Sequence, residues 1–147
     1  MAGAEATQAG GFAGKFVIPA SMVDEIIAHS REDLPNECCG LISGHGDTAA
    51  RLFRARNEFA SPLRYSVHPV DLLRITGEIS DAGEELVAIY HSHTRSPAWP
   101  SQTDINLAVN WPDQVYLICS LENDDDPVVN AFRLGTGEVE QLELQVV

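Results

Sequence analysis

Two kinds of hydrophobic pattern alternate along the chain from residue 15 onward. Three stretches carry apolar residues every three or four positions, which is the spacing of one face of an α-helix. Short apolar or alternating runs lie between them and are typical of β-strands. The pattern predicts helices over residues 22–31, 70–80 and 101–110, and strands over 15–18, 36–44, 50–57, 65–67, 86–91, 115–121, 128–134 and 138–146.

Each predicted helix has an apolar face that should point into the core. Ser21 is expected to cap the first helix, and Trp111-Pro112 to end the third. We expect His29 at the surface or boundary of the first helix, and His45, which lies between two glycines, in an exposed turn. The expected core faces are Met22, Val23, Ile26, Ile27 and Ser30; Leu72, Leu73, Ile75 and Ile79; and Ile105, Leu107 and Val109.

The order of the elements indicates the fold class. Helices and strands are intermixed, and the last strands follow one another, two of them joined across an acidic turn at 123–127. This order predicts an α/β sandwich with a mixed, curved sheet flanked by helices. Residues 1–14 are rich in alanine and glycine and show no periodicity, so we expect a flexible tail followed by one domain over 15–147.

Composition narrows the classes of function. With 147 residues, 44% of them hydrophobic, the chain is long enough for one core, and it has no apolar run long enough to span a membrane. The net charge of −13 disfavours nucleic acid and anionic membranes as partners. Three cysteines, two of them adjacent, do not make a disulfide framework, and no export signal is visible, which favours a cytoplasmic setting.

The strand over 86–91 leads into a cluster of candidate metal ligands. Because strand side chains alternate between faces, His91 and His93 emerge on the same side, with Cα atoms about 7 Å apart. The Pro-rich loop that follows enters a helix whose first turn carries Asp104, where the helix dipole favours the ionised carboxylate. Two imidazole nitrogens and one carboxylate leave a fourth tetrahedral position open, which is the pattern of a catalytic zinc site.

Each part of this cluster also has a purely structural interpretation. A His-x-His pair alone is common at strand ends, and Ser101 with Asp104 alone would be an N-cap followed by an acidic third residue. The combination at fixed offsets arises by chance far less often than either part. We therefore predict that His91, His93 and Asp104 bind one catalytic Zn²⁺.

A catalytic zinc lowers the pKa of its bound water to about 7, but another group must accept the proton and pass it to the leaving amine. Glu37 is the candidate for this role. It follows Pro35-Asn36 and precedes an apolar strand, so it lies at a strand end, where active sites are often assembled. Acidic residues at such places are also commonly solvated, so position alone leaves the role open.

Together, Glu37, His91-Ser92-His93, Ser101 and Asp104 resemble the signature of the JAMM (MPN+, JAB-type) metalloproteases. The similarity extends over nearly the whole chain after about residue 15 and includes the Pro-x-Glu-Cys-Cys-Gly segment at 35–40. The resemblance implies a cytidine-deaminase-like α/β sandwich. It also implies zinc ligation by both histidines and Asp104, a general base and acid at Glu37, and a hydrogen bond from Ser101 to the oxyanion. The zinc signature of the deaminases themselves is missing, so deamination is disfavoured.

Thr94, where many relatives have proline, makes the chain similar to the small bacterial Mec-type members of that family. Those enzymes hydrolyse cysteine from the C-terminal Gly-Gly of a ubiquitin-like sulfur-carrier protein, in cysteine biosynthesis. A tail without side chains can thread a narrow channel or lie as an added strand. The alternatives are a broader peptidase or isopeptidase that deconjugates ubiquitin-like proteins, and a non-catalytic scaffold domain of the same fold.

Several neighbouring residues carry no assigned chemistry. Cys39 and Cys119 are expected to be small core residues, and Cys38 is left open. Trp99 and Arg95 lie between the predicted ligands and either line a groove for a substrate tail or, in the case of Trp99, pack the loop. Asn57 is expected to be structural. The acidic run at 124–126 lacks calcium-loop spacing and is expected to be a solvated turn.

Overall fold

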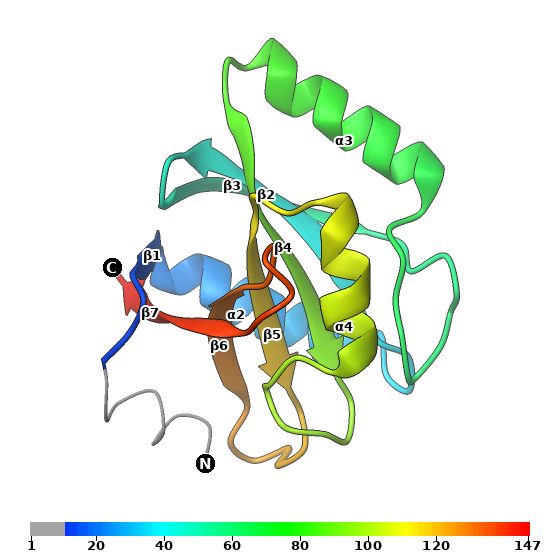
Figure 1. Cartoon of the computed structure of the whole chain (residues 1–147). Helices are drawn as coiled ribbons and strands as arrows, with labels where there is room; N and C mark the ends of the chain where they lie inside the picture. Colours follow the sequence, from blue (N-terminus) through cyan, green and yellow to red (C-terminus); the bar gives the residue numbers. More distant parts are fainter. Residues whose placement is uncertain (1–10) are drawn as a thin grey trace.

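One mixed β-sheet organises the computed structural model, which describes residues 11–147 (Figure 1). Its strands run in the order β1-β3-β2-β4-β5-β6-β7, and β1 pairs with both β3 and β7, so the sheet closes into a barrel. The pairs β1–β3, β1–β7 and β4–β5 are parallel, and the others are antiparallel. The strands are β1 (Lys15–Ile18), β2 (Cys39–His45), β3 (Thr48–Ala55), β4 (Glu85–His93), β5 (Val115–Ser120), β6 (Val128–Arg133) and β7 (Glu140–Val146).

Helices cover the sheet on both sides (Figure 1). They are α2 (Ala20–Glu32), α3 (Pro69–Asp81) and α4 (Gln102–Leu107), the last continued by the 3₁₀ turn η1 (Ala108–Asn110). Two clusters of buried apolar side chains hold the layers together. One contains Met22 and Ile26 of α2, and the other contains Ile75 and Ile79 of α3 together with Ala108 of η1. Because the central strands are covered on both faces, every residue of β5 is buried rather than every second one.

The α/β class and the mixed sheet flanked by helices are confirmed. The sheet differs from the predicted sandwich in being closed, since the pairing of Val17 with Thr48 joins β1 to β3 while β1 also runs along β7. The cytidine-deaminase-like description stays a prediction. Among the described residues, no helix combines the length and the apolar character needed to cross a membrane.

The first helix corrects two predictions. It begins at Ala20 with Pro19 in the N-cap position, so Ser21 is not the cap. His29 is only 4% exposed, and its Nδ1 lies 2.7 Å from the hydroxyl oxygen of Tyr90 on β4. The ring is therefore a buried hydrogen-bonding partner rather than a surface group, because a distant strand supplies the polar contact that burial requires.

Three predicted core positions are wrong as well. Leu73 on α3 is 77% exposed, Leu107 at the end of α4 is 37% exposed, and Val109 in η1 is 70% exposed. The helix predicted over 101–110 changes to a 3₁₀ turn after Leu107, which rotates the last residues away from the α-helical face. The strand predicted over 65–67 is reduced to a single bridge between Asn57 and Val67.

Two residues of the predicted tail, Ala13 and Gly14, form backbone hydrogen bonds with β7. The backbone N–H of Ala13 donates to the carbonyl of Gln141, and that of Glu143 donates to the carbonyl of Gly14. The chain is therefore already hydrogen-bonded alongside β7 two residues before Lys15. The rest of the predicted tail, residues 1–10, lies outside the described residues.

Candidate metal centre

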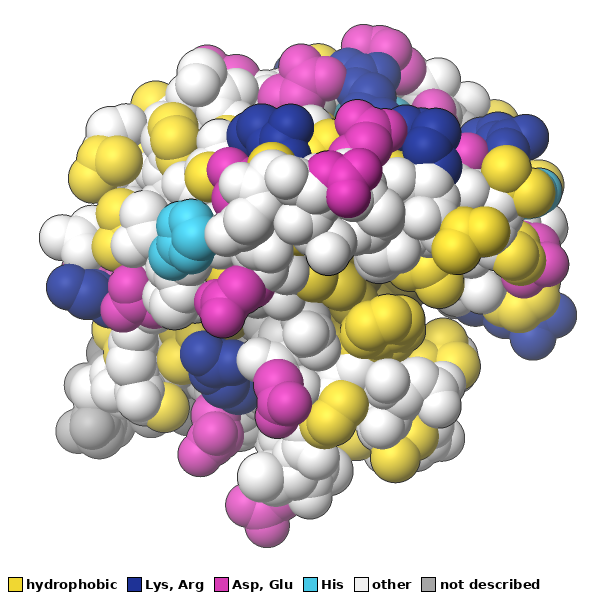
Figure 2. Space-filling view, turned by 90° about the horizontal axis from the view of Figure 1, so that it is seen from above, with side chains coloured by type: hydrophobic (Ala, Val, Ile, Leu, Met, Phe, Trp, Pro, Cys, Tyr) yellow, Lys and Arg dark blue, Asp and Glu magenta, His cyan; other side chains and the backbone are white. Residues whose placement is uncertain are grey.

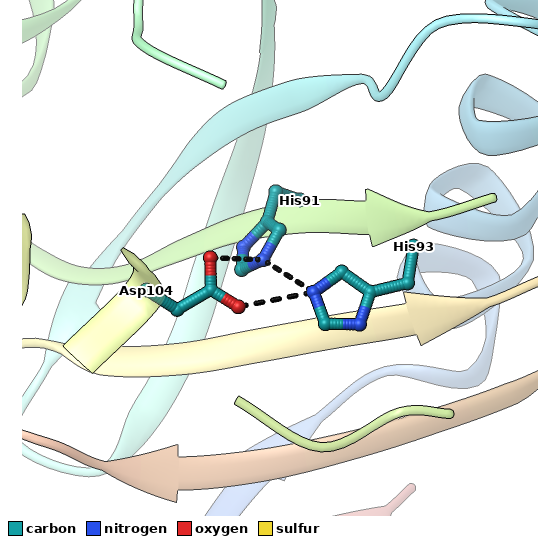
Figure 3. A group of neighbouring side chains, drawn as sticks. All are labelled: His91, His93 and Asp104. Atoms are coloured by element: carbon teal, nitrogen blue, oxygen red, sulfur yellow. Dashed lines mark hydrogen bonds and ion pairs between the residues drawn. The ribbon is translucent and has the colours of Figure 1, made fainter. Parts of the chain in front are cut away.

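The three predicted ligands meet at one point between β4 and α4 (Figure 3). His91 and His93 end β4 on the face that carries Ile89, which belongs to the cluster packed under α3. Asp104 lies in the first turn of α4. The Nε2 atoms of the two histidines are 3.3 Å apart, and they lie 3.2 and 3.0 Å from Asp104 Oδ1 and Oδ2. All three side chains are at least 94% buried.

These distances fit a tetrahedral zinc site. Ligand atoms 2.0–2.2 Å from a tetrahedral zinc lie about 3.3–3.6 Å from one another, within a few tenths of an ångström of the observed contacts. Two ring nitrogens facing each other beside a buried carboxylate also form a donor set that needs a proton or a cation between its members. The nitrogen and oxygen donors suit zinc.

Contacts behind the histidines fix how each ring presents its nitrogen. His93 Nδ1–H donates to the carbonyl of Pro97 at 2.8 Å, since a carbonyl can only accept, and this leaves the neutral ring's Nε2 with a free lone pair. The ring of Tyr65 stacks on His91 with centroids 4.3 Å apart. Burial lowers the pKa of His91, which keeps its imidazole neutral, as metal ligation requires.

Asp104 and Ser101 hold each other at the start of α4. Ser101 Oγ accepts from the Asp104 backbone N–H at 3.0 Å, and Asp104 Oδ2 accepts from the Ser101 N–H at 2.9 Å, which is a capping box. Burial alone would raise the pKa of Asp104, but both histidines and the Ser101 N–H outweigh it and hold that pKa well below its usual range. The carboxylate is therefore ionised and fixed in direction.

Strand register brings Glu37 to the same place from far along the chain. Cys39 of β2 pairs with His91 of β4 in an antiparallel ladder. One residue earlier, the Cys38 N–H donates to Ser92 Oγ at 2.8 Å, and the Ser92 N–H donates to the Cys38 carbonyl at 3.2 Å. Extending this register by one more residue sets Glu37 beside His93.

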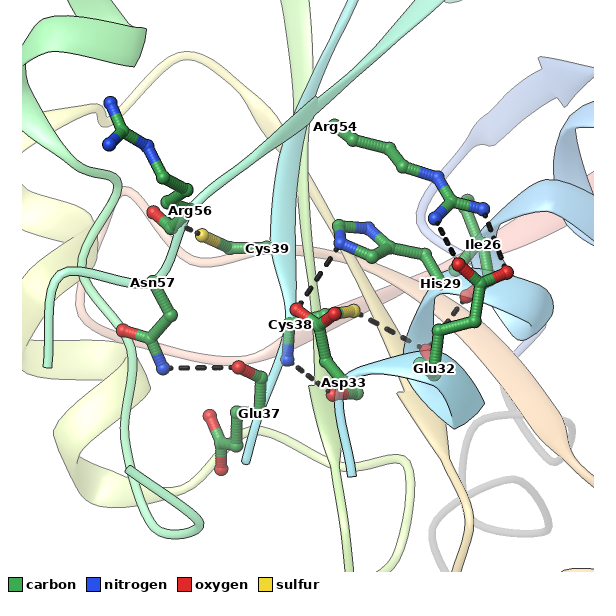
Figure 4. Close-up of polar contacts among 12 residues, drawn as sticks. Ile26, His29, Glu32, Asp33, Glu37, Cys38, Cys39, Arg54, Arg56 and Asn57 are labelled. Carbon is green, nitrogen blue, oxygen red and sulfur yellow. Dashed lines mark hydrogen bonds and ion pairs between the residues drawn. The ribbon is translucent and has the colours of Figure 1, made fainter. Parts of the chain in front are cut away.

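Glu37 is buried, and one of its carboxyl oxygens has no hydrogen bond from the described residues. The residue is 4% exposed, and Oε1 has no hydrogen-bond partner within residues 11–147. Its backbone is anchored instead, because Asn57 Nδ2 donates to the Glu37 carbonyl at 3.1 Å (Figure 4). Burial, with a smaller contribution from the negative charge of Asp104, raises the pKa of Glu37 to about 8 despite the opposing effect of His93.

An open pocket of about 370 Å³ connects these groups to solvent. Glu37, His93 and Ser101 line it from three separate stretches of the chain, so the predicted proton carrier, a predicted ligand and the predicted oxyanion donor lie around one pocket. Trp99 does not line it. Its ring packs edge-on against Phe132, with centroids 5.1 Å apart, which favours the loop-packing interpretation. The remaining lining residues are Pro62, Leu63, Thr94, Arg95 and Ser96.

Sequence reasoning missed two supporting residues. Tyr65, expected only as part of a strand, stacks on His91. Ser92 links the Glu37 segment to β4. Asn57, expected to be structural, anchors the Glu37 backbone. Ser92 lies between the two histidines, which was the one available signal. The predicted burial of Cys39 and Cys119 is confirmed, and Cys38 is buried too.

Residues 19–135 match the family described as prokaryotic homologs of the JAB domain. The chain is similar to the CysO-cysteine peptidase of Mycobacterium tuberculosis (strain H37Rv), with 35% identity over 133 residues that cover 89% of this chain and 90% of that protein. It is also similar to the desampylase of Haloferax volcanii, with 38% identity over 110 residues that cover 70% and 78% of the two chains.

Solved structures have the same fold. Protein DSY2949 from Desulfitobacterium hafniense matches with a TM-score of 0.81 and 32% identity, covering 90% of this chain and 92% of that one. A structure described as "JAMM: A Metalloprotease-like Zinc Site in the Proteasome and Signalosome" matches with a TM-score of 0.54 and 19% identity, covering 90% and 97%, and supports the fold alone. The chain thus belongs to the JAB-domain (JAMM/MPN+) family of hydrolases and resembles its small bacterial members.

Proposed function

We propose that this chain is a zinc-dependent peptidase that hydrolyses the amide bond after the C-terminal Gly-Gly of a ubiquitin-like sulfur-carrier protein and releases cysteine. The observation that carries the proposal is the buried trio of His91, His93 and Asp104 beside a pocket shared with Glu37 and Ser101. The similarity to a CysO-cysteine peptidase over 90% of its length supports cysteine as the leaving residue.

The two histidines and Asp104 would hold the metal, with the side-chain directions fixed by Pro97 and Ser101. When bound, a zinc ion would polarise the scissile carbonyl and make water a stronger nucleophile near neutral pH. The ionised Asp104 contributes one negative charge to the site, so a divalent cation there leaves a net positive field toward the pocket.

Glu37 is suited to carry the proton between water and the leaving amine. Its carboxyl group is buried, lacks a hydrogen bond at Oε1, and has a pKa raised to about 8, which is close to neutral pH. A group with such a pKa can accept a proton and give it up again without a large free-energy cost. The anchor from Asn57 keeps its backbone in place during both transfers.

Ser101 is suited to stabilise the oxyanion that forms on the scissile carbonyl. Its Oγ already accepts the Asp104 backbone N–H through a lone pair, which leaves its hydroxyl hydrogen free to donate into the pocket. The capping box holds this hydroxyl before substrate arrives, so no reorganisation is needed when charge develops.

The proposal is tested by incubating the zinc-loaded chain with the CysO–cysteine adduct, the substrate named for the mycobacterial relative, and weighing the products. We expect loss of one cysteine residue from the carrier, about one zinc per chain by elemental analysis, loss of cleavage with a chelator, and recovery on adding zinc. Failure to cleave the adduct in the metallated form would refute the cysteine-releasing function.

A second candidate is a broader peptidase or isopeptidase that deconjugates ubiquitin-like proteins, and it is supported by the 38% identity to a desampylase. The two are separated by comparing the same carrier joined through its Gly-Gly end either to cysteine or to the ε-amine of a lysine in a second protein. Faster cleavage of the lysine conjugate would favour the second candidate, and no metal-dependent cleavage of either would favour a scaffold role.

A further inference from the structure

Arg95 differs from every other arginine of the described chain in having no partner. The protein has 9 basic and 22 acidic side chains, and acidic and basic groups lie side by side across the face shown in Figure 2. Within residues 11–147, Arg95 alone among the arginines makes no hydrogen bond, ion pair or ring contact. The others pair with carboxylates (Arg31, Arg51, Arg54, Arg56 and Arg74), donate to a carbonyl (Arg133) or stack on Phe59 (Arg64).

The backbone around Arg95 is nevertheless fixed on both sides. Thr94 Oγ1 donates to the Pro62 carbonyl at 3.2 Å, and Ser120 Oγ donates to the Ser96 carbonyl at 2.6 Å. One residue further, the Pro97 carbonyl accepts from His93. The loop is therefore pinned to β5, to the Pro62 loop and to a metal ligand, while the exposed guanidinium between these anchors is free to bind something else.

Arg95 lines the pocket that holds the groups proposed to react. Arg95 lines the same pocket as Glu37, His93 and Ser101 and is its only arginine or lysine. Consecutive Cα atoms are 3.8 Å apart, so the Cα of Arg95 is at most about 7.6 Å from that of His93. An extended arginine side chain covers a comparable distance, which allows the guanidinium to reach a group one residue beyond the scissile bond.

We propose that Arg95 binds the free α-carboxylate of a single-residue leaving group, and that this contact makes the enzyme selective for carriers extended by one residue. The inference rests on the proposed peptidase function and adds a specificity-determining residue to it. A planar guanidinium can hold a carboxylate through two parallel hydrogen bonds. When cysteine is the leaving residue, its carboxylate stands directly after the scissile amide.

The same contact disfavours the competing substrates. A longer extension moves its terminal carboxylate away from the scissile bond by up to about 3.5 Å for each added residue, and a neutral peptide group replaces it. A lysine isopeptide presents an aliphatic stem at this place and no charge. In both cases Arg95 loses its ionic partner, so selectivity follows from a missing attraction rather than from a steric block.

The experiment compares the mycobacterial CysO protein carrying one C-terminal cysteine as the free acid with the same adduct as the carboxamide. For the wild-type enzyme we expect kcat/KM to be roughly tenfold or more higher for the acid, the size of a hydrogen-bonded charge contact. In Arg95→Gln, kcat/KM for the acid should fall to the value for the amide, and kcat/KM for the amide should hardly change. Arg95→Lys, which keeps the charge without the planar fork, should retain part of the preference.

Arg64→Gln is the matched control, because it removes a neighbouring exposed arginine that does not line the pocket. It should keep the preference for the acid, and the melting temperatures of all variants should agree. Equal wild-type rates on acid and amide, or an Arg95→Gln variant that loses the same factor on both, would overturn the inference while leaving the peptidase function intact. No cleavage of either adduct by the wild type would instead overturn the proposed function.

Discussion

Replacing Glu37 with glutamine should lower turnover and, at the same time, raise the stability of the metal-free protein. The pKa of the buried carboxyl is raised from 4.5 to about 8. The folded-state pKa lies above the unfolded-state pKa. The carboxyl therefore does not destabilise the fold below pH 4.5, and its destabilising effect grows with pH until about pH 8. The pH of 7 lies about 2.5 units above the unfolded-state pKa of the carboxyl. At 1.36 kcal/mol per unit, the carboxyl therefore lowers the free energy of unfolding by roughly 3 kcal/mol at this pH.

Glutamine keeps the shape and removes the charge, but its amide is still buried beside no partner, which costs about 1 kcal/mol. Metal-free Glu37→Gln should therefore be about 2 kcal/mol more stable than metal-free wild type at pH 7, a rise in Tm of roughly 4–8 °C for a chain of this size. Turnover should fall by about 10²–10⁴-fold, the contribution of a positioned proton carrier. Zinc content should stay unchanged, since Glu37 is not among the three residues proposed to bind the metal.

The assay measures thermal unfolding of both proteins in chelator between pH 5 and pH 8, then zinc content and turnover after reloading. The gap in Tm should widen as pH rises. Glu58→Gln, which changes an exposed glutamate in the neighbouring loop, should show neither effect. A Tm gap that is constant with pH would refute the description of Glu37 as a desolvated carboxyl, and near-normal turnover would remove it from the mechanism.

Three further changes probe the rest of the site and its support. Asp104→Asn should lower zinc content at least tenfold by elemental analysis after dialysis, because it removes the one anionic ligand; full metallation would exclude Asp104 as a ligand. Ser101→Ala should lower kcat by about 10²-fold and stability by about 1 kcal/mol, whereas Ser101→Thr should preserve the helix cap. Equal kcat values for the two variants would argue against an oxyanion role for the hydroxyl. Asp71→Asn should lower stability by about 1 kcal/mol at pH 7. This is less than the full pKa shift of Asp71 would give, because the Arg56 partner is 63% exposed and solvent screens the pair. The hydrogen bonds from Arg56 lower the pKa of Asp71 from 3.8 to about 2, so this stabilisation is complete above pH 3.8 and lost as pH falls toward 2; a difference in Tm that does not shrink over that range would contradict it.

The convergence of His91, His93 and Asp104 could be predicted because the rules that bring these side chains together are local. Alternation along a strand puts His91 and His93 on one face, and the first turn of the next helix places Asp104. The same kind of rule failed wherever a distant element decides the environment. His29 is buried because Tyr90 of β4 offers a hydroxyl, and Leu73 is exposed because nothing in the described chain covers that side of α3.

Tyr65 illustrates a second limit of sequence reasoning. An aromatic residue in a short irregular segment carries no periodic signal. The support that Tyr65 gives to the site comes from stacking on His91, which is distant in the sequence. The unpaired state of Arg95 is likewise invisible in the sequence, since arginines with and without partners look the same until every carboxylate has been placed. Supporting contacts of this kind depend on the complete tertiary arrangement rather than on spacing.

Glu37 depends on strand register rather than on local pattern, which explains why sequence alone left its role open. A slip of one residue between β2 and β4 would turn its carboxyl to the opposite face of the sheet, toward α2. Two features oppose such a slip. Ser92 Oγ accepts the Cys38 N–H, and Gly40 admits the ring of Tyr90 at a place where any Cβ would collide with it. Because the hydroxyl of Tyr90 is in turn held by His29 of α2, the glycine of the Cys-Cys-Gly segment connects the packing of the first helix to the position of Glu37.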